Sequence, residues 1–248
     1  MTRINSRQSA VDASDFFPTP QWATRSFVEW FFAAPFPRPL KLWEPACGQG
    51  HMAHPLLEYF DQVVASDLLD YGYGRAQVMN FLTADCGDVD IIFTNPPFNR
   101  AEEFALKALS QHPDAMVVFF VKANWLFSQG RYDRLFSNPD WQPTHLVFNT
   151  VRVPCLQGRV DPDGSTNADY LWIVWARGKA VAAIRPEFQD QSLIWIPPER
   201  TRRRLTVNDK RHNTLMAKIE LPEAVWIPDQ LPPQNGMDTT PLFGGSQE

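Results

Sequence analysis

The feature that most constrains the fold is a repeated order of elements, in which a short apolar run ends at a polar turn and a helical stripe follows. The first run, residues 40–43, stops at the glycine-containing loop 44–50, and apolar residues then recur at helical spacing. Further runs of buried-strand composition occupy 63–66, 89–94 and 116–121. Strands that alternate with helices in this way predict a doubly wound, mostly parallel α/β sheet.

Elements on either side extend this sheet. A helix is expected from Gln21, because apolar residues between Ala23 and Phe31 follow one helical face and Pro20 stands at its first turn. Apolar runs at 145–153 and 170–175, joined by a polar loop, predict two further strands. This closing pair gives the predicted sheet an antiparallel edge.

Composition divides the chain into four parts. Residues 1–15 form a polar arm that we expect to be flexible, and residues 16–180 form the α/β domain. Residues 181–227 are a small basic extension, with an arginine cluster between Arg200 and Arg211. The tail 228–248 is rich in Pro, Gln, Gly and Ser and is expected to be disordered.

The overall composition excludes several classes of protein. The 248 residues carry 23 Lys and Arg against 28 Asp and Glu, with 44% hydrophobic residues, which excludes a wholly disordered, collagen-like or coiled-coil chain. No stretch approaches the roughly 20 apolar residues of a membrane helix, and three cysteines without a CxxC pair favour a reducing compartment, so a cytoplasmic location is expected. The net charge of -5 gives no long-range attraction to nucleic acid, so a nucleic-acid site would need a local basic patch.

The glycine loop 44–50 and the end of the next strand together indicate a nucleoside-containing cofactor. A Gly-x-Gly turn alone is weak support, because it often only lets a helix start close to a sheet. Asp67 ends the next strand about 20 residues further on, where a carboxylate can accept both hydroxyls of a ribose. Glu44 at the head of the loop disfavours a pyrophosphate and suits a cofactor with an ammonium group, such as S-adenosylmethionine.

The motif Asn95-Pro96-Pro97-Phe98 follows the third apolar run and is the sharpest signal for chemistry. It places an amide, a stiffened backbone carbonyl and an aromatic face at the mouth of an α/β sheet. The Asn95 side-chain oxygen and the Pro96 carbonyl could hold both N–H bonds of an exocyclic amine, while Phe98 stacks on the base. The motif therefore predicts methyl transfer to an amine, against the alternative of a plain Pro-Pro turn with a capping Asn.

The order of these motifs resembles a known family. Phe17-Pro18-Thr19-Pro20, the Glu44–Gly50 loop, Asp67 and Asn95–Phe98 together resemble the class I S-adenosylmethionine-dependent amino-methyltransferases, particularly phage and prophage DNA N6-adenine methyltransferases. The resemblance covers about residues 15–178. It implies a Rossmann-like fold with a seven-stranded sheet, S-adenosylmethionine as cofactor and DNA as partner.

The resemblance also implies roles for individual residues. Phe17, Thr19 and Pro20 would lie at the cofactor's methionine end, and the loop residues Glu44, Pro45, Ala46, Gly48 and Gly50 would line its amino-acid part. Family members usually place an Asp before a Phe-Leu pair to meet the cofactor's adenine. Here the matching segment is Asn80-Phe81-Leu82, and Asp85 is a competing candidate for the contact with the cofactor's adenine.

The sequence leaves three hypotheses about function open. The leading hypothesis is N6-adenine methylation of DNA with short or loose sequence specificity, because no sizeable target-recognition domain is present. The same motif also serves RNA adenine or guanine methylation and protein glutamine methylation. A non-catalytic S-adenosylmethionine-binding fold that binds nucleic acid is a third possibility, which the intact Asn95–Phe98 motif disfavours.

Two further sequence motifs are weaker signals. Cys47, His51 and His54 have a metal-like spacing, but Cys47 belongs to the glycine loop and no fourth ligand is nearby, so no metal is expected. Thr240–Phe243 faintly resembles a peptide that docks on a sliding clamp, and an ordinary disordered tail is the favoured interpretation.

Overall fold

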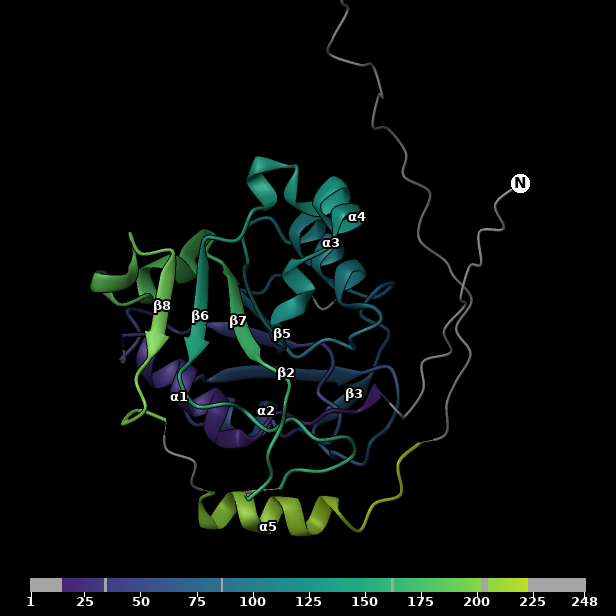
Figure 1. Ribbon diagram of the computed structural model, residues 1–248. Coiled ribbons are helices and arrows are strands. Elements are labelled where there is room, and N and C mark those ends of the chain that lie inside the picture. The colour runs from purple at the N-terminus through teal and green to yellow at the C-terminus, as the bar shows by residue number, and fades with distance from the viewer. Residues whose placement is uncertain (1–14, 34, 86, 162, 202–204, 223–248) are drawn as a thin grey trace, which may run out of the picture.

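A computed structural model describes residues 15–33, 35–85, 87–161, 163–201 and 205–222 (Figure 1). The arm before Asp15, Arg202–Arg204 and the whole tail with its clamp-like segment therefore lie outside the described residues. Within the described part of the chain, no helix is long and apolar enough to cross a membrane.

One sheet of eight strands forms the centre of the structure, in the order β3-β2-β1-β4-β5-β7-β6-β8. The strands are β1 (Lys41–Glu44), β2 (Gln62–Asp67), β3 (Ala76–Val78), β4 (Ile91–Thr94), β5 (Met116–Lys122), β6 (His145–Asn149), β7 (Tyr170–Trp175) and β8 (Leu193–Ile196). Only β7 is antiparallel to its neighbours, β5 and β6. This arrangement is the class I methyltransferase fold, as predicted.

The strands at the β8 side of the sheet differ in two details from the predicted antiparallel edge. β7 lies near this side rather than at the outermost position, because β6 pairs with it and β8 pairs in parallel with β6. β8 is an eighth strand beyond the seven that the resemblance implied. Its four residues alternate between exposed and buried. A pattern of this length is too short to identify a strand from the sequence.

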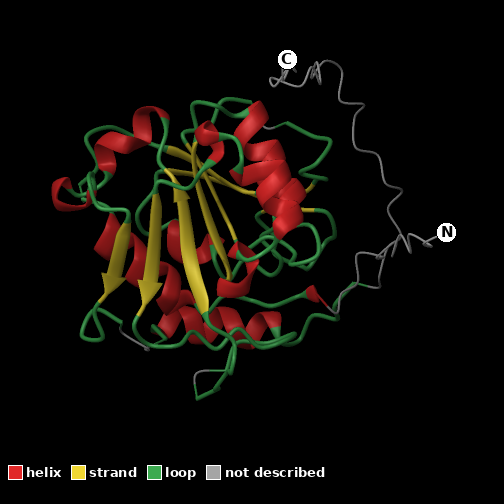
Figure 2. Cartoon of the chain, turned by 45° about the horizontal axis from the view of Figure 1, so that its top comes forward, coloured by secondary structure: helices red, strands yellow, loops and turns green. Residues whose placement is uncertain are grey.

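Helices cover both faces of the sheet (Figure 2). The α-helices are α1 (Gln21–Phe31), α2 (Ala53–Leu56), α3 (Ala101–Gln111), α4 (Gln129–Arg131) and α5 (Val207–Met216). Shorter turns are η2 (Ala123–Leu126), η3 (Tyr132–Phe136), η4 (Pro139–Trp141), η5 (Gly178–Ala183) and η6 (Pro186–Phe188), of which η3 is a single π-helical turn.

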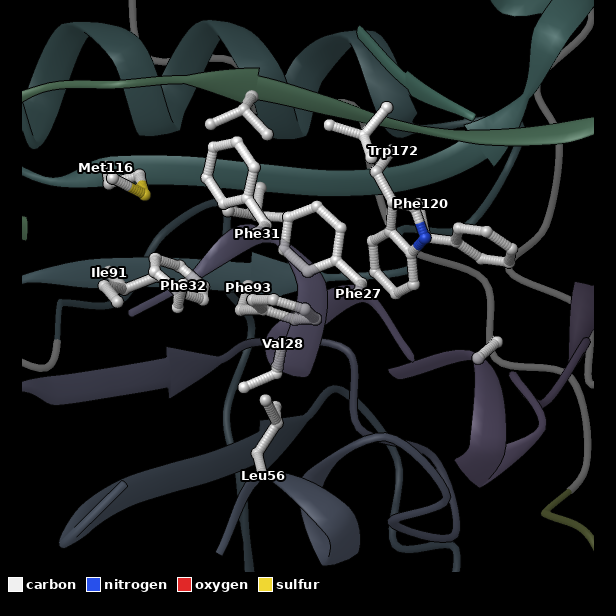
Figure 3. Close-up of a cluster of buried hydrophobic side chains, with 14 of the residues drawn as sticks. Phe27, Val28, Phe31, Phe32, Leu56, Ile91, Phe93, Met116, Phe120 and Trp172 are labelled. Atoms are coloured by element: carbon white, nitrogen blue, oxygen red, sulfur yellow. The ribbon is translucent and has the colours of Figure 1, made fainter. Parts of the chain in front are cut away.

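Alternation along the central strands divides the core into two layers. Ile91 and Phe93 of β4 belong to the cluster that contains α1 and α2, whereas Ile92 belongs to the cluster that contains α3. On the α1 side, Phe27 stacks on Trp172 with ring centroids 4.6 Å apart (Figure 3). A continuous apolar sequence in β4 and β5 therefore reflects strands that are covered on both faces.

The C-terminal helix α5 is fixed to the α/β domain by a buried ion pair. Thr206 and Asp209 form a capping box at its N-terminus, and Asp209 also accepts two hydrogen bonds from Arg25 of α1, at 2.7 and 2.8 Å. The Asp209 side chain is 0% exposed. Burial alone would raise the pKa of Asp209, but Arg25 and the hydrogen bonds with Thr206 together outweigh it and lower that pKa. This stabilisation is therefore present above the pKa of an unfolded carboxyl group and is lost as pH falls through the folded value.

We expect Asp209→Ala to lower the free energy of unfolding by about 3 kcal/mol, the lower end of the range for a broken buried pair, because Arg25 keeps its second partner, Glu58. Glu58→Ala is the matched control, since Glu58 is 40% exposed and its loss should cost no more than about 1 kcal/mol. Urea unfolding measures both variants. Equal losses would show that the buried pair does not hold α5.

Candidate active site

A pocket lies at the carboxyl edge of β1, β2 and β4. β1 pairs in parallel with both of the other strands, so the loops that follow all three emerge at one edge of the sheet. The pocket has a volume of about 970 Å³, part of which is open to solvent. The pocket is lined by Asp15, Phe16, Phe17, Pro18, Thr19, Glu44, Pro45, Ala46, Cys47, Gly48, His51, Met52, Asp67, Leu68, Tyr71, Asn80, Phe81, Leu82, Asn95, Pro96, Pro97, Phe98, Arg100 and Phe104.

Of the site residues predicted from the sequence, all except Pro20 and Gly50 line this pocket. The Pro20 carbonyl accepts a hydrogen bond from Ala23 and so begins α1. Gly50 has a φ of 77°, and a Cβ there would lie 2.6 Å from the Tyr73 ring. Both residues shape the segments beside the pocket, and their predicted contact with a cofactor stays a prediction.

Of the two candidates for contact with the cofactor's adenine, one lies on the pocket wall, and the contact itself stays a prediction. Asn80, Phe81 and Leu82 line the pocket, whereas Asp85, the competing candidate, does not. The Asn80 side-chain oxygen accepts a hydrogen bond from the Leu82 backbone at 3.0 Å, which fixes the turn. Asp85 makes a similar turn with Gly87 instead.

Asp67 ties the end of β2 to the glycine loop. Its carboxylate accepts a hydrogen bond from the Gly48 N–H at 2.7 Å and a longer one from Leu69 at 3.3 Å. Gly48 itself has a φ of 49°, in the left-handed region that favours glycine. Burial raises the pKa of Asp67 to about 6, although the backbone N–H groups oppose the shift.

Glu44 is the most deeply buried carboxylate of the pocket, at 1% exposed. Its Oε2 atom has no hydrogen-bond partner among the described residues. Burial, together with the neighbouring Asp67, raises the pKa of Glu44 well above its usual range. With Asp15 also on the wall, the pocket has an acidic lining that favours a ligand with a positive charge.

Asn95 is oriented by the segment that precedes α1. Its amide nitrogen donates to the Phe17 carbonyl at 2.9 Å and to the Thr19 hydroxyl at 3.1 Å. Because a carbonyl can only accept, these bonds determine which end of the amide is nitrogen. The Asn95 oxygen is thereby left buried on the wall of the pocket, without a partner in the part of the chain that the structure describes.

A strap of residues 15–19 closes one side of the pocket and was recognised only in part from the sequence. Its Phe16 ring stacks on Tyr71, with centroids 5.1 Å apart, and a Cβ on Gly48 would lie 2.5 Å from that ring. The Phe16 carbonyl accepts a hydrogen bond from Gly158, in the loop after β6. Phe16 lies next to the Phe17–Pro20 motif, but no periodic signal marks Tyr71 as its partner.

The sequence also gave no indication that α5 reaches the glycine loop. Gln49 donates to the Met216 carbonyl at 3.1 Å, and the Gln49 carbonyl lies 2.9 Å from the His212 ring nitrogen. His212 stacks on His54, with centroids 4.9 Å apart, and packs edge-on against His51. Burial lowers the pKa of His51 to about 3 and also lowers the pKa of His212, so these two rings are neutral at neutral pH. No group of three or more His, Cys, Asp or Glu among the described residues is placed to hold a metal.

The basic cluster of the extension is only partly described. Arg200 lies over the Trp30 ring, 5.5 Å from its centre, and its carbonyl accepts a hydrogen bond from Ser26. Arg202–Arg204, at the centre of the cluster, lie outside the described residues.

The sequence and the structure were compared with those of known proteins. No protein-family model and no curated protein matches the sequence. Similar solved structures include a dimethyladenosine transferase from Plasmodium falciparum (15% identity, TM-score 0.43, covering 64% of this chain and 61% of that one). Another is the EcoKI type I restriction enzyme M protein (16% identity, TM-score 0.47, covering 71% of this chain and 46% of that one). A third is magnesium protoporphyrin IX methyltransferase from Synechocystis with bound SAM (15% identity, TM-score 0.42, covering 63% of this chain and 79% of that one).

At such low identity the likeness is limited to the fold, and the chain spans less than two thirds of the first two proteins named. The strand order and the pocket at the carboxyl edge define a class I methyltransferase fold with an acidic, partly aromatic ligand pocket. Function must therefore be inferred from this chain's own residues.

Gly48→Ala is expected to destabilise the strap and the glycine loop together. The left-handed backbone alone should cost about 1 to 2 kcal/mol, and the added Cβ would also displace the Phe16 ring. Gly74→Ala is the control, because a Cβ there meets nothing within 4 Å and should change stability by less than about 0.5 kcal/mol. Thermal unfolding compares the two. A Gly48→Ala protein as stable as the control would contradict this role.

Proposed function

We propose that the protein transfers a methyl group from S-adenosylmethionine to the exocyclic N6 amine of adenine in DNA. The observation that carries the proposal is the Asn95 amide. Its two N–H groups are used by Phe17 and Thr19, and its oxygen is presented, buried and unpaired, to the pocket. An acceptor held in this way suits a ligand N–H donor, because burial without a partner is costly.

The acidic wall fits the cofactor. S-adenosylmethionine carries an ammonium and a sulfonium group, and when bound it supplies the electrophilic methyl group. Glu44, with its unpaired Oε2, would hold positive charge, and Asp67 at the end of β2 would accept the ribose hydroxyls. Asn80–Leu82 would lie along the adenine of the cofactor.

The residues of the Asn95–Phe98 motif would act on the target amine. The nitrogen of an aromatic amine is a poor nucleophile, because its lone pair is delocalised into the ring. Hydrogen bonds from both N–H groups to the Asn95 oxygen and the Pro96 carbonyl favour the tetrahedral nitrogen that attacks the methyl group. Since Asn95 is already oriented by Phe17 and Thr19, this acceptor needs no rearrangement as charge develops.

Two aromatic rings support adenine as the group that carries the amine. Phe98 and Phe17 lie with centroids 5.1 Å apart at the wall that contains Asn95. An adenine buried in a duplex cannot reach this wall, so the base must be flipped out or already unpaired. Aromatic side chains at this position favour a flat base over the flexible side chain of glutamine.

The substrate polymer is tested by offering cofactor with a tritiated methyl group together with unmethylated genomic DNA, bulk RNA or protein in separate reactions. Nucleoside and amino-acid analysis then identifies the product. Label in N6-methyladenine of DNA supports the proposal. Label only in RNA bases or in glutamine would assign the site to another substrate, and cofactor binding without transfer to any polymer would favour a non-catalytic binding module.

Asn95→Ala is expected to lower kcat by roughly a hundredfold to a thousandfold, because it removes a preorganised polar partner of the developing charge. Cofactor affinity should stay within about twofold of the unaltered protein. Asn99→Ala is the matched control, since Asn99 is an exposed amide in the same loop and should keep full activity. Label-transfer rates and calorimetry measure both effects. An Asn95→Ala protein that still makes N6-methyladenine at a comparable rate would show that the amine is held elsewhere.

Asp67→Ala is expected to weaken cofactor binding by about 1 to 3 kcal/mol, the cost of leaving hydroxyl groups unpaired. Asp61→Ala, an exposed carboxylate just before the opposite end of the same strand, should have no effect. Because the pKa of Asp67 is raised to about 6, affinity should be constant above neutral pH and fall by up to about tenfold per pH unit below pH 6. Calorimetry across this range measures it. The same pH profile in Asp67→Ala would assign the titration to another group.

A further inference from the structure

Lys122 lies over the aromatic rings at the mouth of the pocket. It is the last residue of β5, which pairs in parallel with β4, so it emerges at the same edge as the Asn95–Phe98 motif. Its ammonium nitrogen lies 4.1 Å from the centre of the Phe98 ring and 5.1 Å from the centre of the Phe17 ring. Lys122 itself is not among the residues that line the pocket, whereas both rings are.

Among the described residues, these two rings are the groups that contact the Lys122 ammonium. Among the described residues no carboxylate lies within ion-pair distance of it and no acceptor hydrogen-bonds it, in contrast to Lys107, whose ammonium donates to the Ala84 carbonyl. Nearby arginines are already paired: Arg131 and Arg134 contact Glu102, and Arg100 contacts Glu103. A partly exposed ammonium that is held only by ring faces is easily displaced.

The position of Lys122 conflicts with the proposed role of Phe98 unless the lysine moves. A base that stacks on the face of Phe98 that Lys122 covers would occupy the same space as the ammonium. The lysine side chain is a flexible four-carbon stem, so the ammonium can swing away from the ring without a change in the backbone. An extruded nucleotide brings its own phosphates to the mouth, where a displaced ammonium would meet them.

We propose that Lys122 covers the Phe98 ring in the free protein and transfers its ammonium to a backbone phosphate when a nucleotide base takes its place. This inference rests on the proposed function and deepens it, because it specifies a polynucleotide as the substrate. A glutamine side chain would supply neither an aromatic face for Phe98 nor a phosphate for Lys122. The exchange also gives a local source of attraction to nucleic acid in a chain whose net charge is -5.

The test compares Lys122→Met, which keeps an unbranched apolar stem, with Lys122→Arg, which keeps the charge. The substrate is an oligonucleotide with one unpaired adenine, assayed by label transfer over a salt series. Free adenosine, which has the base but no phosphate, serves as a competitive inhibitor. Thermal unfolding and calorimetric cofactor binding confirm that each variant is folded with an intact cofactor site.

We expect Lys122→Met to raise KM for the oligonucleotide several-fold at low salt and to reduce the slope of log kcat/KM against log salt by about 1, the value for one lost phosphate contact. Inhibition by adenosine should be unchanged or stronger, because the competing ammonium is gone. Lys122→Arg should keep the slope of the unaltered protein.

Two results would overturn this inference while leaving the proposed function intact. One is an unchanged KM and salt slope in Lys122→Met. The other is an equal weakening of oligonucleotide and adenosine binding, which would make Lys122 a packing residue for Phe98. If the unaltered protein binds cofactor but methylates no nucleic acid, both the proposed function and this inference fail.

Discussion

The parallel pairing of β1 with β2 and β4 is the constraint on which the rest of the site depends. Parallel strands run in the same direction, so the polar residues that end them meet at one edge of the sheet. Glu44, Asp67 and the residues that follow Thr94 are far apart in the chain but surround one pocket. Two-sided burial of β4 between α1 and α3 fixes this register, because a slip of one residue would exchange its two apolar faces.

The pocket combines groups that are costly to bury without a ligand. Glu44 and Asn95 each keep an oxygen that no group of the described residues satisfies, and burial raises the pKa of both Glu44 and Asp67. Such groups are retained at functional sites because a ligand completes them. A cation beside the carboxylates and an N–H donor beside Asn95 would do so, and the proposed cofactor and target amine carry these groups.

The segments outside the central sheet contribute to the pocket through a few specific bonds. The strap before α1 orients Asn95 and rests its Phe16 ring on Gly48. Helix α5, although separated from the glycine loop by more than 150 residues, contacts both the backbone and the side chain of Gln49. Composition placed α5 and β8 in a separate extension, whereas both pack directly on the α/β domain.

The sequence by itself determined the order of the central strands and helices, and with it the fold class, because hydrophobic periodicity and glycine turns are local signals. It also located Asp67, Asn95 and Phe98, since each follows directly from the end of a strand. It did not predict the short strands β3 and β8 or the helix α5. Only the tertiary structure decided that Phe17 and Thr19 orient the Asn95 amide, that Tyr71 stacks on Phe16, and that Lys122 covers Phe98. These are contacts between segments whose relative positions depend on packing, and no local pattern of residues encodes them.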